Sequence, residues 1–199
     1  MHKISDPHDL SGITVISDMD DVLFGWSRGF MEAFAEDYPD LEILSPELRD
    51  TFDMFRPEDA EHHEQIRATL DKPGLYARLE PIPGNIEALL EMSDRGIDVI
   101  IASSPWRANP TCVDDKLDAL DKYMGPGWSG RAIFTKDKTR VRGTYLFDDK
   151  PDVVGGLDPE WEHIHYTQPH NATRTDRRRI NHLSEALPLI LSDNLVGTR

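Results

Sequence analysis

Cysteine is almost absent from this chain, and long apolar runs are missing altogether. Cys112 is the only cysteine among 199 residues, so no disulfide can form within the chain and no cysteine-based metal site is expected. No apolar run approaches the roughly 20 residues of a membrane-spanning helix, and the polar first residues lack the apolar core of a signal peptide. The sequence therefore predicts a cytoplasmic protein with no membrane partner.

Basic residues are also scarce. Lys and Arg together number 22, against 37 Asp and Glu, which gives a formal net charge of −15. Proteins that bind the nucleic-acid backbone or an anionic lipid surface need a basic surface of their own, so neither is an expected partner. A chain of this length is expected to form one sizeable core with a modest insertion rather than two full domains.

The most informative segment is a short apolar run that ends in acids. Residues 13–16 read Ile-Thr-Val-Ile, which is typical of a buried strand, and Asp18 and Asp20 follow them. Side chains two apart on extended backbone face the same way, so both carboxylates can converge on one cation or phosphate. An acidic surface loop is the commoner explanation of Asp-x-Asp taken alone, so the rest of the chain decides between the two.

Strands and helices alternate along much of the remaining chain. Further buried strands are expected at 97–104, 131–135, 145–149 and 163–167, and helices at 26–38, 85–95, 113–124 and about 177–191. Strands that are apolar on both faces are typical of parallel sheets covered by helices on two sides. We therefore expect an α/β fold whose core is a Rossmann-like parallel sheet flanked by helices.

Residues 24–79 contain no convincing strand. Apolar and aromatic residues recur there at helical spacing, and prolines stand at typical helix starts. The sequence therefore predicts a small helical cap over residues 24–79, inserted after the first strand. Residues 1–23 and 80–199 would then form the core domain.

Polar side chains follow four of the expected strands. They are Asp18 with Asp20, Ser103 with Ser104, Lys138, and Asp148 with Asp149. Because the carboxyl ends of parallel strands lie along one edge of a sheet, these residues are expected to gather in one crevice. Carboxylates suit a hard cation, hydroxyl groups bind phosphate oxygens, and a lysine offsets phosphate charge. The pattern predicts a site for a metal ion and a phosphate group.

The same residues resemble the four motifs of the haloacid dehalogenase (HAD) superfamily of aspartyl phosphatases. Asp18-Met-Asp20, Ser103, Lys138 and Asp148-Asp149 match those motifs in order and in strand context. Longer phrases are similar to the cytosolic and mitochondrial 5′(3′)-deoxyribonucleotidases, among them residues 73–84, 134–139, 147–151, 161–163 and 170–171. The resemblance spans roughly residues 12 to 192 and is weakest between Phe24 and Asp71.

This resemblance implies a mechanism and a set of roles. Asp18 would attack phosphorus and form an aspartyl-phosphate, and Asp20 would protonate the leaving oxygen and then activate water. Mg²⁺ would be held by Asp18, the main-chain carbonyl of Asp20 and Asp149, with Asp148 as a supporting acid. The phosphoryl oxygens would be bound by Ser103, Ser104, Lys136 and Lys138.

Three positions depart from the pattern of these relatives. Asp21 fills a position that is often glycine; it is expected to point to solvent, and the alternative is an outer-shell contact to the metal ion. Ser103 replaces a threonine and keeps the hydroxyl group. Lys136 replaces an arginine, so the point charge of an ammonium group stands where the relatives have a planar guanidinium group.

The substrate pocket is assigned to aromatic residues in and near the cap, because caps exclude water and carry specificity. Trp26 lies where the relatives place an aromatic residue that stacks on the base, and Tyr76 and Trp106 are weaker candidates. The alternative for Trp26 and Tyr76 is packing within the cap, and the alternative for Trp106 is anchoring of the helix that follows it.

The resemblance thus implies a Mg²⁺-dependent phosphatase of nucleoside monophosphates, with deoxypyrimidine nucleotides preferred and, by analogy, a homodimer as a possible assembly. Two alternatives stay open. One is a HAD phosphatase for another small phosphomonoester, since fold and catalytic residues do not specify the leaving group. The other is a phosphate-binding regulatory protein without turnover, against which the presence of both Asp18 and Asp20 argues.

Overall fold

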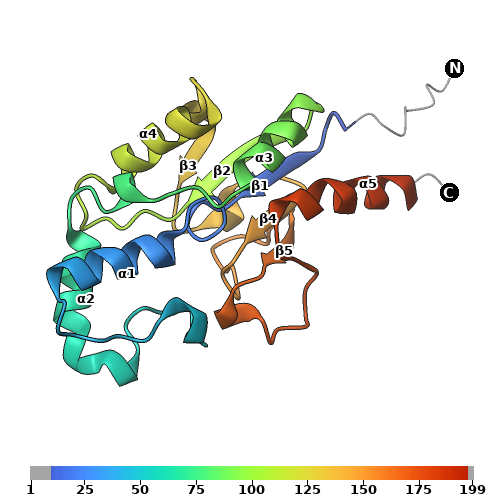
Figure 1. Cartoon of the computed structure of the whole chain (residues 1–199). Coiled ribbons are helices and arrows are strands. Elements are labelled where there is room, and N and C mark those ends of the chain that lie inside the picture. Colours follow the sequence, from blue (N-terminus) through green and yellow to red (C-terminus); the bar gives the residue numbers. More distant parts are fainter. Residues whose placement is uncertain (1–9, 197–199) are drawn as a thin grey trace, which may run out of the picture.

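The computed structural model describes residues 10–196. Within them, six parallel strands form one sheet in the order β3-β2-β1-β4-β5-β6 (Figure 1). The strands are β1 (Thr14–Ser17), β2 (Asp98–Ser103), β3 (Ala132–Phe134), β4 (Tyr145–Asp148), β5 (Glu162–Tyr166) and β6 (Arg179–Ile180). The α-helices are α1 (Trp26–Asp37), α2 (His63–Asp71), α3 (Asn85–Asp94), α4 (Cys112–Met124) and α5 (Ala186–Val196). The expected fold class, a parallel sheet flanked by helices, is confirmed.

The two faces of the sheet are covered unevenly. Alternate residues of a strand point to opposite faces, and Val15 of β1 joins the large core whereas Ile16 joins a second, smaller cluster. Helices α3, α4 and α5 pack in one layer beside one another, with α3 against β2. The smaller cluster is covered by Val141 and Trp161, from the connections on either side of β4. The first of these connections is short and the second is rich in glycine and proline, so neither forms an α-helix.

Strand β1 lies where the order of the strands reverses. It pairs with β2 on one side and with β4 on the other, and the N–H of Asp18 extends this pairing by donating to the carbonyl of Phe147 at 2.9 Å. In open α/β sheets, ligands bind beyond the carboxyl ends of the strands at such a reversal. The topology therefore puts Asp18 at the place where a ligand crevice is expected.

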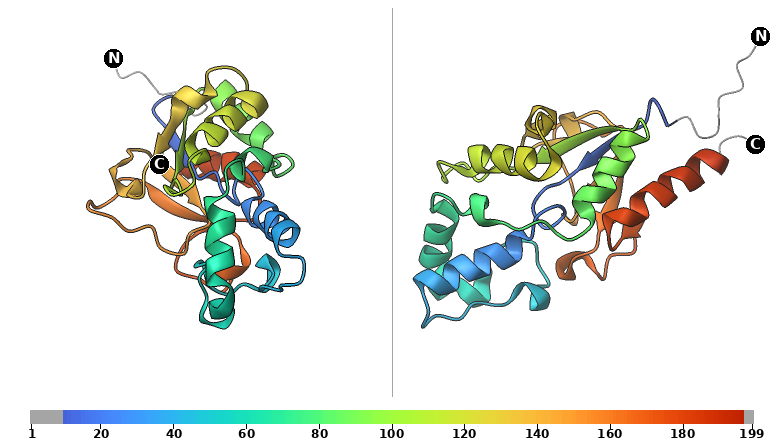
Figure 2. Two further views of the ribbon diagram at one scale, coloured as in Figure 1. Left: turned by 90° about the vertical axis from the view of Figure 1, so that its left-hand side faces the viewer. Right: turned by 45° about the horizontal axis from the view of Figure 1, so that its top comes forward.

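The segment between β1 and α3 leaves the sheet edge and returns to it (Figure 2). It contains α1, α2 and three short 3-10 helices, η1 (Pro46–Leu48), η2 (Pro57–His62) and η3 (Tyr76–Arg78). Its two ends run side by side, because Gly25 N–H donates to the Glu80 carbonyl at 3.0 Å and Ile82 N–H donates to the Leu23 carbonyl at 2.8 Å. We call residues 24–79 the inserted segment.

The C-terminal part differs from the expectation. A helix beginning at about residue 177 is wrong, because Arg179 and Ile180 form β6 and pair with His165 and Tyr166 of β5. Helix α5 begins only at Ala186, where the apolar residues are dense enough to pack against the core. None of the helices in residues 10–196 combines the length and the apolar character needed to span a bilayer.

Candidate active site

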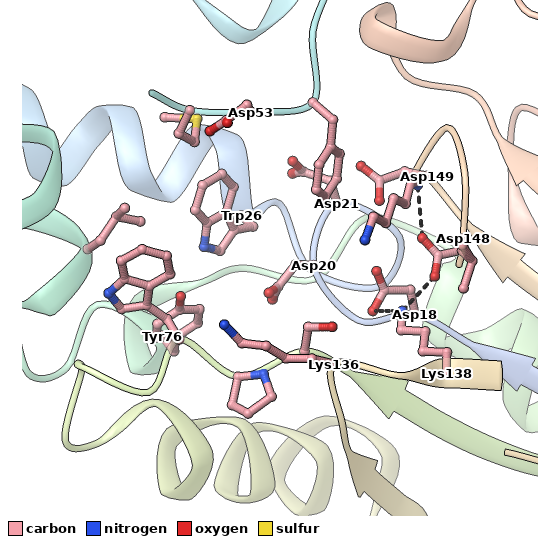
Figure 3. Close-up of a pocket in the computed structure, with 18 of the residues that line it drawn as sticks. Asp18, Asp20, Asp21, Trp26, Asp53, Tyr76, Lys136, Lys138, Asp148 and Asp149 are labelled. Atoms are coloured by element: carbon pink, nitrogen blue, oxygen red, sulfur yellow. Dashed lines mark hydrogen bonds and ion pairs between the residues drawn. The ribbon is translucent and has the colours of Figure 1, made fainter. Parts of the chain in front are cut away.

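A cavity of about 470 Å³ opens at the carboxyl ends of the central strands, beside the inserted segment (Figure 3). It is lined by most of the predicted site residues, namely Asp18, Asp20, Trp26, Tyr76, Ser104, Trp106, Lys136, Lys138, Asp148 and Asp149. Ser103 is only 1% exposed and lies behind these residues. The strand ends therefore bring together side chains that are far apart in the sequence.

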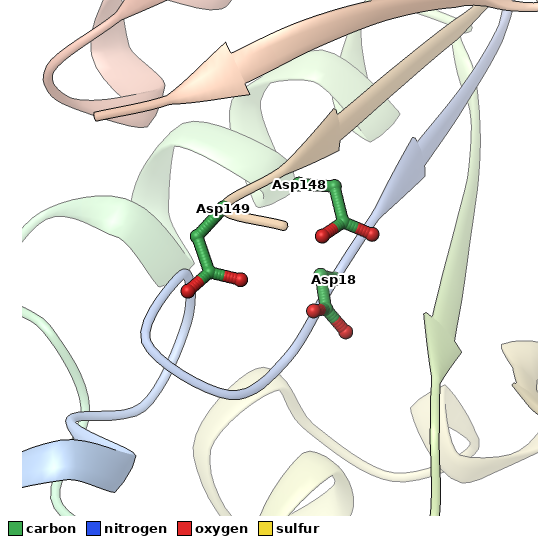
Figure 4. Close-up of side chains that lie close together, drawn as sticks. All are labelled: Asp18, Asp148 and Asp149. Atoms are coloured by element: carbon green, nitrogen blue, oxygen red, sulfur yellow. The ribbon is translucent and has the colours of Figure 1, made fainter. Parts of the chain in front are cut away.

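Three carboxylates meet on one side of the cavity (Figure 4). One oxygen from each of Asp18, Asp148 and Asp149 lies within 4.8 Å of the others. Burial, and then repulsion from neighbouring carboxylates, raises the pKa of Asp18 and Asp149 above the usual 3.8. Buried carboxylates that are costly to ionise without a counter-charge suit a hard divalent cation. This cluster could therefore hold a metal ion.

Lys138 lies between two of these carboxylates. Its Nζ is 2.8 Å from Asp18 Oδ1 and 2.6 Å from Asp148 Oδ2. Burial alone would lower the pKa of Lys138, but the two carboxylates outweigh burial and raise it, so the ammonium group stays charged. The second oxygen of Asp148 accepts the N–H of Lys150 at 2.8 Å. Both oxygens of Asp148 are thus already bound by donors of the protein.

Asp149 is fixed by the short helix η6 (Pro169–Asn171). The Nε2 of His170 lies 2.9 Å from the Asp149 carbonyl oxygen and 3.2 Å from its Oδ2. Asn171 Nδ2 donates to the same carbonyl at 2.7 Å. These contacts hold the loop after β4 in the position that presents Asp149 to Asp18.

Lys116 was missed by the sequence analysis. It lies in α4, is 1% exposed, and its Nζ is 2.5 Å from Asp20 Oδ2 and 2.9 Å from Ser103 Oγ. It belongs to the buried stripe of α4, together with Cys112 and Leu120. A lysine in such a stripe needs a partner for its charge, and that is the signal that could have identified it.

Asp21 does not point to solvent, so that expectation is wrong. It is 8% exposed with φ of 54°, and its carboxylate accepts the N–H of Ser27 at 2.8 Å and the Ser27 hydroxyl as well. Because Ser27 belongs to the first turn of α1, Asp21 caps that helix. Aspartate tolerates the left-handed conformation better than most residues other than glycine. Asp21 therefore has a structural role, because its carboxylate links the end of β1 to the first helix of the inserted segment.

Arg49 is a second residue that the sequence analysis missed. It follows η1, lines the cavity and is buried. Its Nη2 donates to Ser27 Oγ at 3.1 Å, so it is linked through Ser27 to Asp21. No helical or strand pattern predicts this contact, because Arg49 comes from an irregular part of the inserted segment.

The opposite end of the cavity is aromatic. Trp26 stacks on Phe30 with ring centroids 5.5 Å apart, and Trp106 stacks on Phe55 at 6.2 Å. Trp106 Nε1 also donates to Asp71 Oδ1 at 2.6 Å, which ties the loop after β2 to the end of α2. Trp26 and Trp106 therefore pack against neighbours and line the cavity at the same time.

Three other predicted residues occupy different positions in the wall. Lys136 lines the cavity (Figure 3). The Ser104 hydroxyl donates to the Thr135 carbonyl at 3.0 Å, so the main chain already engages it. Tyr76 is almost fully buried, and its ring centroid is 4.8 Å from the Nζ of Lys116.

The fold is shared with solved HAD-family hydrolases. One from Deinococcus radiodurans R1, described with bound phosphate and sodium, has a TM-score of 0.57 at 16% identity and covers 94% of this chain and 97% of that chain. At this identity the likeness shows the fold alone. The sheet topology therefore defines the class of the protein by its fold, which is the HAD fold.

The sequence comparisons identify the family. The family model described as "5′ nucleotidase, deoxy (Pyrimidine), cytosolic type C protein" matches residues 12–196. The human mitochondrial 5′(3′)-deoxyribonucleotidase is 31% identical over an alignment of 192 residues, gaps included, which covers 90% of this chain and 82% of that protein. The human cytosolic type is 34% identical over an alignment of 164 residues, which covers 80% of this chain and 82% of that protein. The chain therefore belongs to this nucleotidase family of phosphoric monoester hydrolases, and the resemblance noted in the sequence is confirmed.

Proposed function

We propose that this protein is a Mg²⁺-dependent phosphatase that hydrolyses nucleoside monophosphates through an aspartyl-phosphate, with deoxypyrimidine nucleotides preferred. One observation carries the proposal. The carboxylate of Asp18 is held by Lys138 at the end of β1, beside a second acid, Asp20, in a cavity with aromatic walls. Both human relatives are named 5′(3′)-deoxyribonucleotidases, which supports a nucleotide as the substrate.

The reaction is divided between two acids. A carboxylate oxygen of Asp18 attacks phosphorus, a new O–P bond forms, and the bond from phosphorus to the leaving oxygen breaks. Asp20 donates its proton to that leaving oxygen and becomes a carboxylate. In the second step Asp20 takes a proton from water, the water oxygen bonds to phosphorus, and the bond between phosphorus and the Asp18 oxygen breaks, which frees inorganic phosphate and regenerates the Asp18 carboxylate.

The metal ion is assigned to the carboxylate cluster. Asp18, Asp149 and the main-chain carbonyl of Asp20 are the proposed ligands, and Asp148 is assigned a supporting role because Lys138 and Lys150 already occupy its oxygens. When bound, Mg²⁺ would neutralise charge on the phosphoryl group.

The phosphoryl oxygens are assigned to cations and hydroxyl groups around Asp18. Lys138 lies closest to the attacking carboxylate, and Lys136 adds a second positive charge to the cavity wall. Ser103 and Ser104 complete the set, with Ser104 the weaker of the two because the Thr135 carbonyl accepts its hydroxyl.

The inserted segment is proposed to act as the cap that selects the leaving group. Residues 24–79 would exclude water during the reaction, and Trp26, Tyr76 and Trp106 would contact the nucleoside. The aromatic end of the cavity supports this assignment, because flat apolar side chains offer stacking surfaces for a base.

The proposal includes the setting of the enzyme. The binding partner is a small phosphate ester. Nucleic acid and membranes are not expected partners, because the net charge of −15 disfavours binding to polyanions. We further propose action in the cytoplasm and a homodimer, by analogy with the cytosolic-type relative and with enzymes of this kind.

Release of inorganic phosphate from a panel of substrates tests the proposal. The panel holds deoxynucleoside and nucleoside monophosphates with each base and several sugar phosphates, each assayed with Mg²⁺ or with EDTA. We expect the highest kcat/KM for deoxypyrimidine monophosphates and no turnover with EDTA. Faster hydrolysis of a sugar phosphate than of any nucleotide would show that the substrate is another phosphomonoester. Absence of turnover on every member of the panel would favour a phosphate-binding protein without catalytic activity.

A further inference from the structure

Within residues 10–196, Lys116 is the one buried lysine that the mechanism above does not use. It projects from α4 toward the end of β1 and contacts Asp20 and Ser103 at 2.5 and 2.9 Å. A buried ammonium group is expensive unless paired and hydrogen-bonded, and here its two partners are the proposed acid and a residue of the proposed phosphate site. If Lys116 only filled the core, contact with these two residues in particular would not be expected.

The donor chemistry of lysine fixes the orientation of both partners. An ammonium group only donates hydrogen bonds, so Asp20 Oδ2 and Ser103 Oγ must both accept from Lys116. Ser103 therefore keeps its own O–H free to donate to a phosphoryl oxygen. In the part of the chain that the structure describes, Asp20 Oδ1 is buried and has no hydrogen-bond partner. The free oxygen of Asp20 is thus the one that is not bound by Lys116.

We propose that Lys116 is a positioning residue for proton transfer to the leaving group, an inference that rests on the proposed function. Lys116 holds the Asp20 carboxyl group through Oδ2, and this contact fixes the orientation in which Asp20 delivers its proton to the leaving oxygen. As the O–P bond to the leaving group breaks, this proton moves to the leaving oxygen, and the carboxylate that remains on Asp20 is paired with the ammonium group. Ser103, fixed by the same lysine, is placed to donate to the phosphoryl group.

The leaving group distinguishes this role from a structural one. An alkyl phosphate such as ethyl phosphate needs a proton on its leaving oxygen, whereas p-nitrophenyl phosphate releases a stable anion without one. The value of kcat/KM reports only the steps up to departure of the leaving group, so it is insensitive to hydrolysis of the aspartyl-phosphate. A residue that positions the acid must therefore affect kcat/KM for the alkyl ester far more than for the aryl ester.

The test compares Lys116→Met with the wild type on both esters in the presence of Mg²⁺. We expect kcat/KM to fall about 10²-fold for ethyl phosphate, the lower end of what acid catalysis contributes, and less than about tenfold for p-nitrophenyl phosphate. Asp20→Asn is expected to show the same selectivity. Lys122→Met, on the exposed side of the same helix, is the matched control and leaves the ratio of the two esters unchanged.

A burst experiment gives a second readout. Because Asp20 also activates water, Lys116→Met is expected to release one equivalent of p-nitrophenolate quickly and then turn over slowly. Lys116→Gln, which keeps a donor for Asp20, serves if the methionine variant does not fold, and its selectivity is expected to have the same sign.

Two outcomes separate the inference from the proposed function. Equal losses of kcat/KM on the two esters, in variants that melt like the wild type, would overturn the role of Lys116 and leave the phosphatase intact. A wild-type protein inactive on both esters and on nucleotides would overturn the proposed function and this inference together.

Discussion

The two ends of the cavity are built in different ways. At the carboxylate end, which the proposal makes the catalytic end, Asp18 and Asp148 lie at the ends of strands and Lys138 lies in the connection after β3. All three are buried and are joined by ion pairs of 2.6–2.8 Å. At the other end, Trp106 and Phe55 are half-buried and held mainly by ring contacts, and Phe52 is 45% exposed. The carboxylate end is therefore fixed by the sheet, whereas the aromatic end rests on ring contacts between side chains, which single substitutions can alter at small cost.

The largest expected effect is at the catalytic end. Asp18→Asn should lower kcat/KM on every substrate by about 10³-fold or more, because the proposed nucleophile is lost. Its melting temperature without metal should be unchanged or higher, because burial makes the ionised form of Asp18 costly at neutral pH. Phosphate release and thermal unfolding measure the two quantities. Comparable activity in the variant would remove Asp18 as the nucleophile.

Metal binding should stabilise the same end of the cavity. Mg²⁺ relieves the repulsion among Asp18, Asp148 and Asp149, so it should add about 2.7 kcal/mol to the free energy of unfolding at about 100 times its Kd. The measurement is thermal unfolding with Mg²⁺ and then with excess EDTA. Asp149→Asn is the control and should lose most of this shift. An equal shift in the variant would mean that the ion binds elsewhere.

A smaller effect is expected at the aromatic end. Trp106→Ala should raise KM for nucleotides about tenfold, which corresponds to about 1.4 kcal/mol of binding, and should change kcat little, because a stacking surface is lost and the acids stay in place. Steady-state kinetics with a nucleotide and with ethyl phosphate check this, since the small ester offers no base to stack. If KM rises equally for both substrates, Trp106 supports the site rather than contacting the nucleoside.

The smallest effect concerns the link between the two ends. Asp21→Ala removes the cap of α1 and should cost about 1 kcal/mol of unfolding free energy, measured by urea denaturation. Asp21→Asn keeps an acceptor for Ser27 and tolerates the left-handed backbone, so it should cost less. Equal stability of wild type and the alanine variant would show that this cap contributes nothing.

The difference between the two ends also explains what the sequence could predict. Asp18, Ser103, Lys138 and Asp149 stand at or just beyond the ends of short apolar runs, and parallel topology brings such ends together whatever the details of packing. The fold class and the gathering of these residues at one edge of the sheet therefore followed from local patterns. Asp20 was found by its spacing from Asp18, but its lysine partner was not, because Lys116 lies within a helix of another part of the chain.

The errors of the sequence analysis have physical causes. Asp21 was expected in solvent because a charge in a loop usually is, yet the N-terminus of α1 lies close enough for its carboxylate to cap it. The last helix was placed too early because the pairing of Arg179 and Ile180 with β5 depends on a neighbouring strand and not on local propensity. Arg49 was missed because irregular backbone leaves no periodic signal.

The inserted segment crosses to the sheet domain at two adjacent points, where Gly25 meets Glu80 and Leu23 meets Ile82. An insertion whose two ends lie side by side does not distort the flanking strands, whatever its length. The whole inserted segment can therefore be replaced in evolution while the strands keep their register. A hydrolase built in this way can change its substrate specificity through substitutions confined to one segment of the chain.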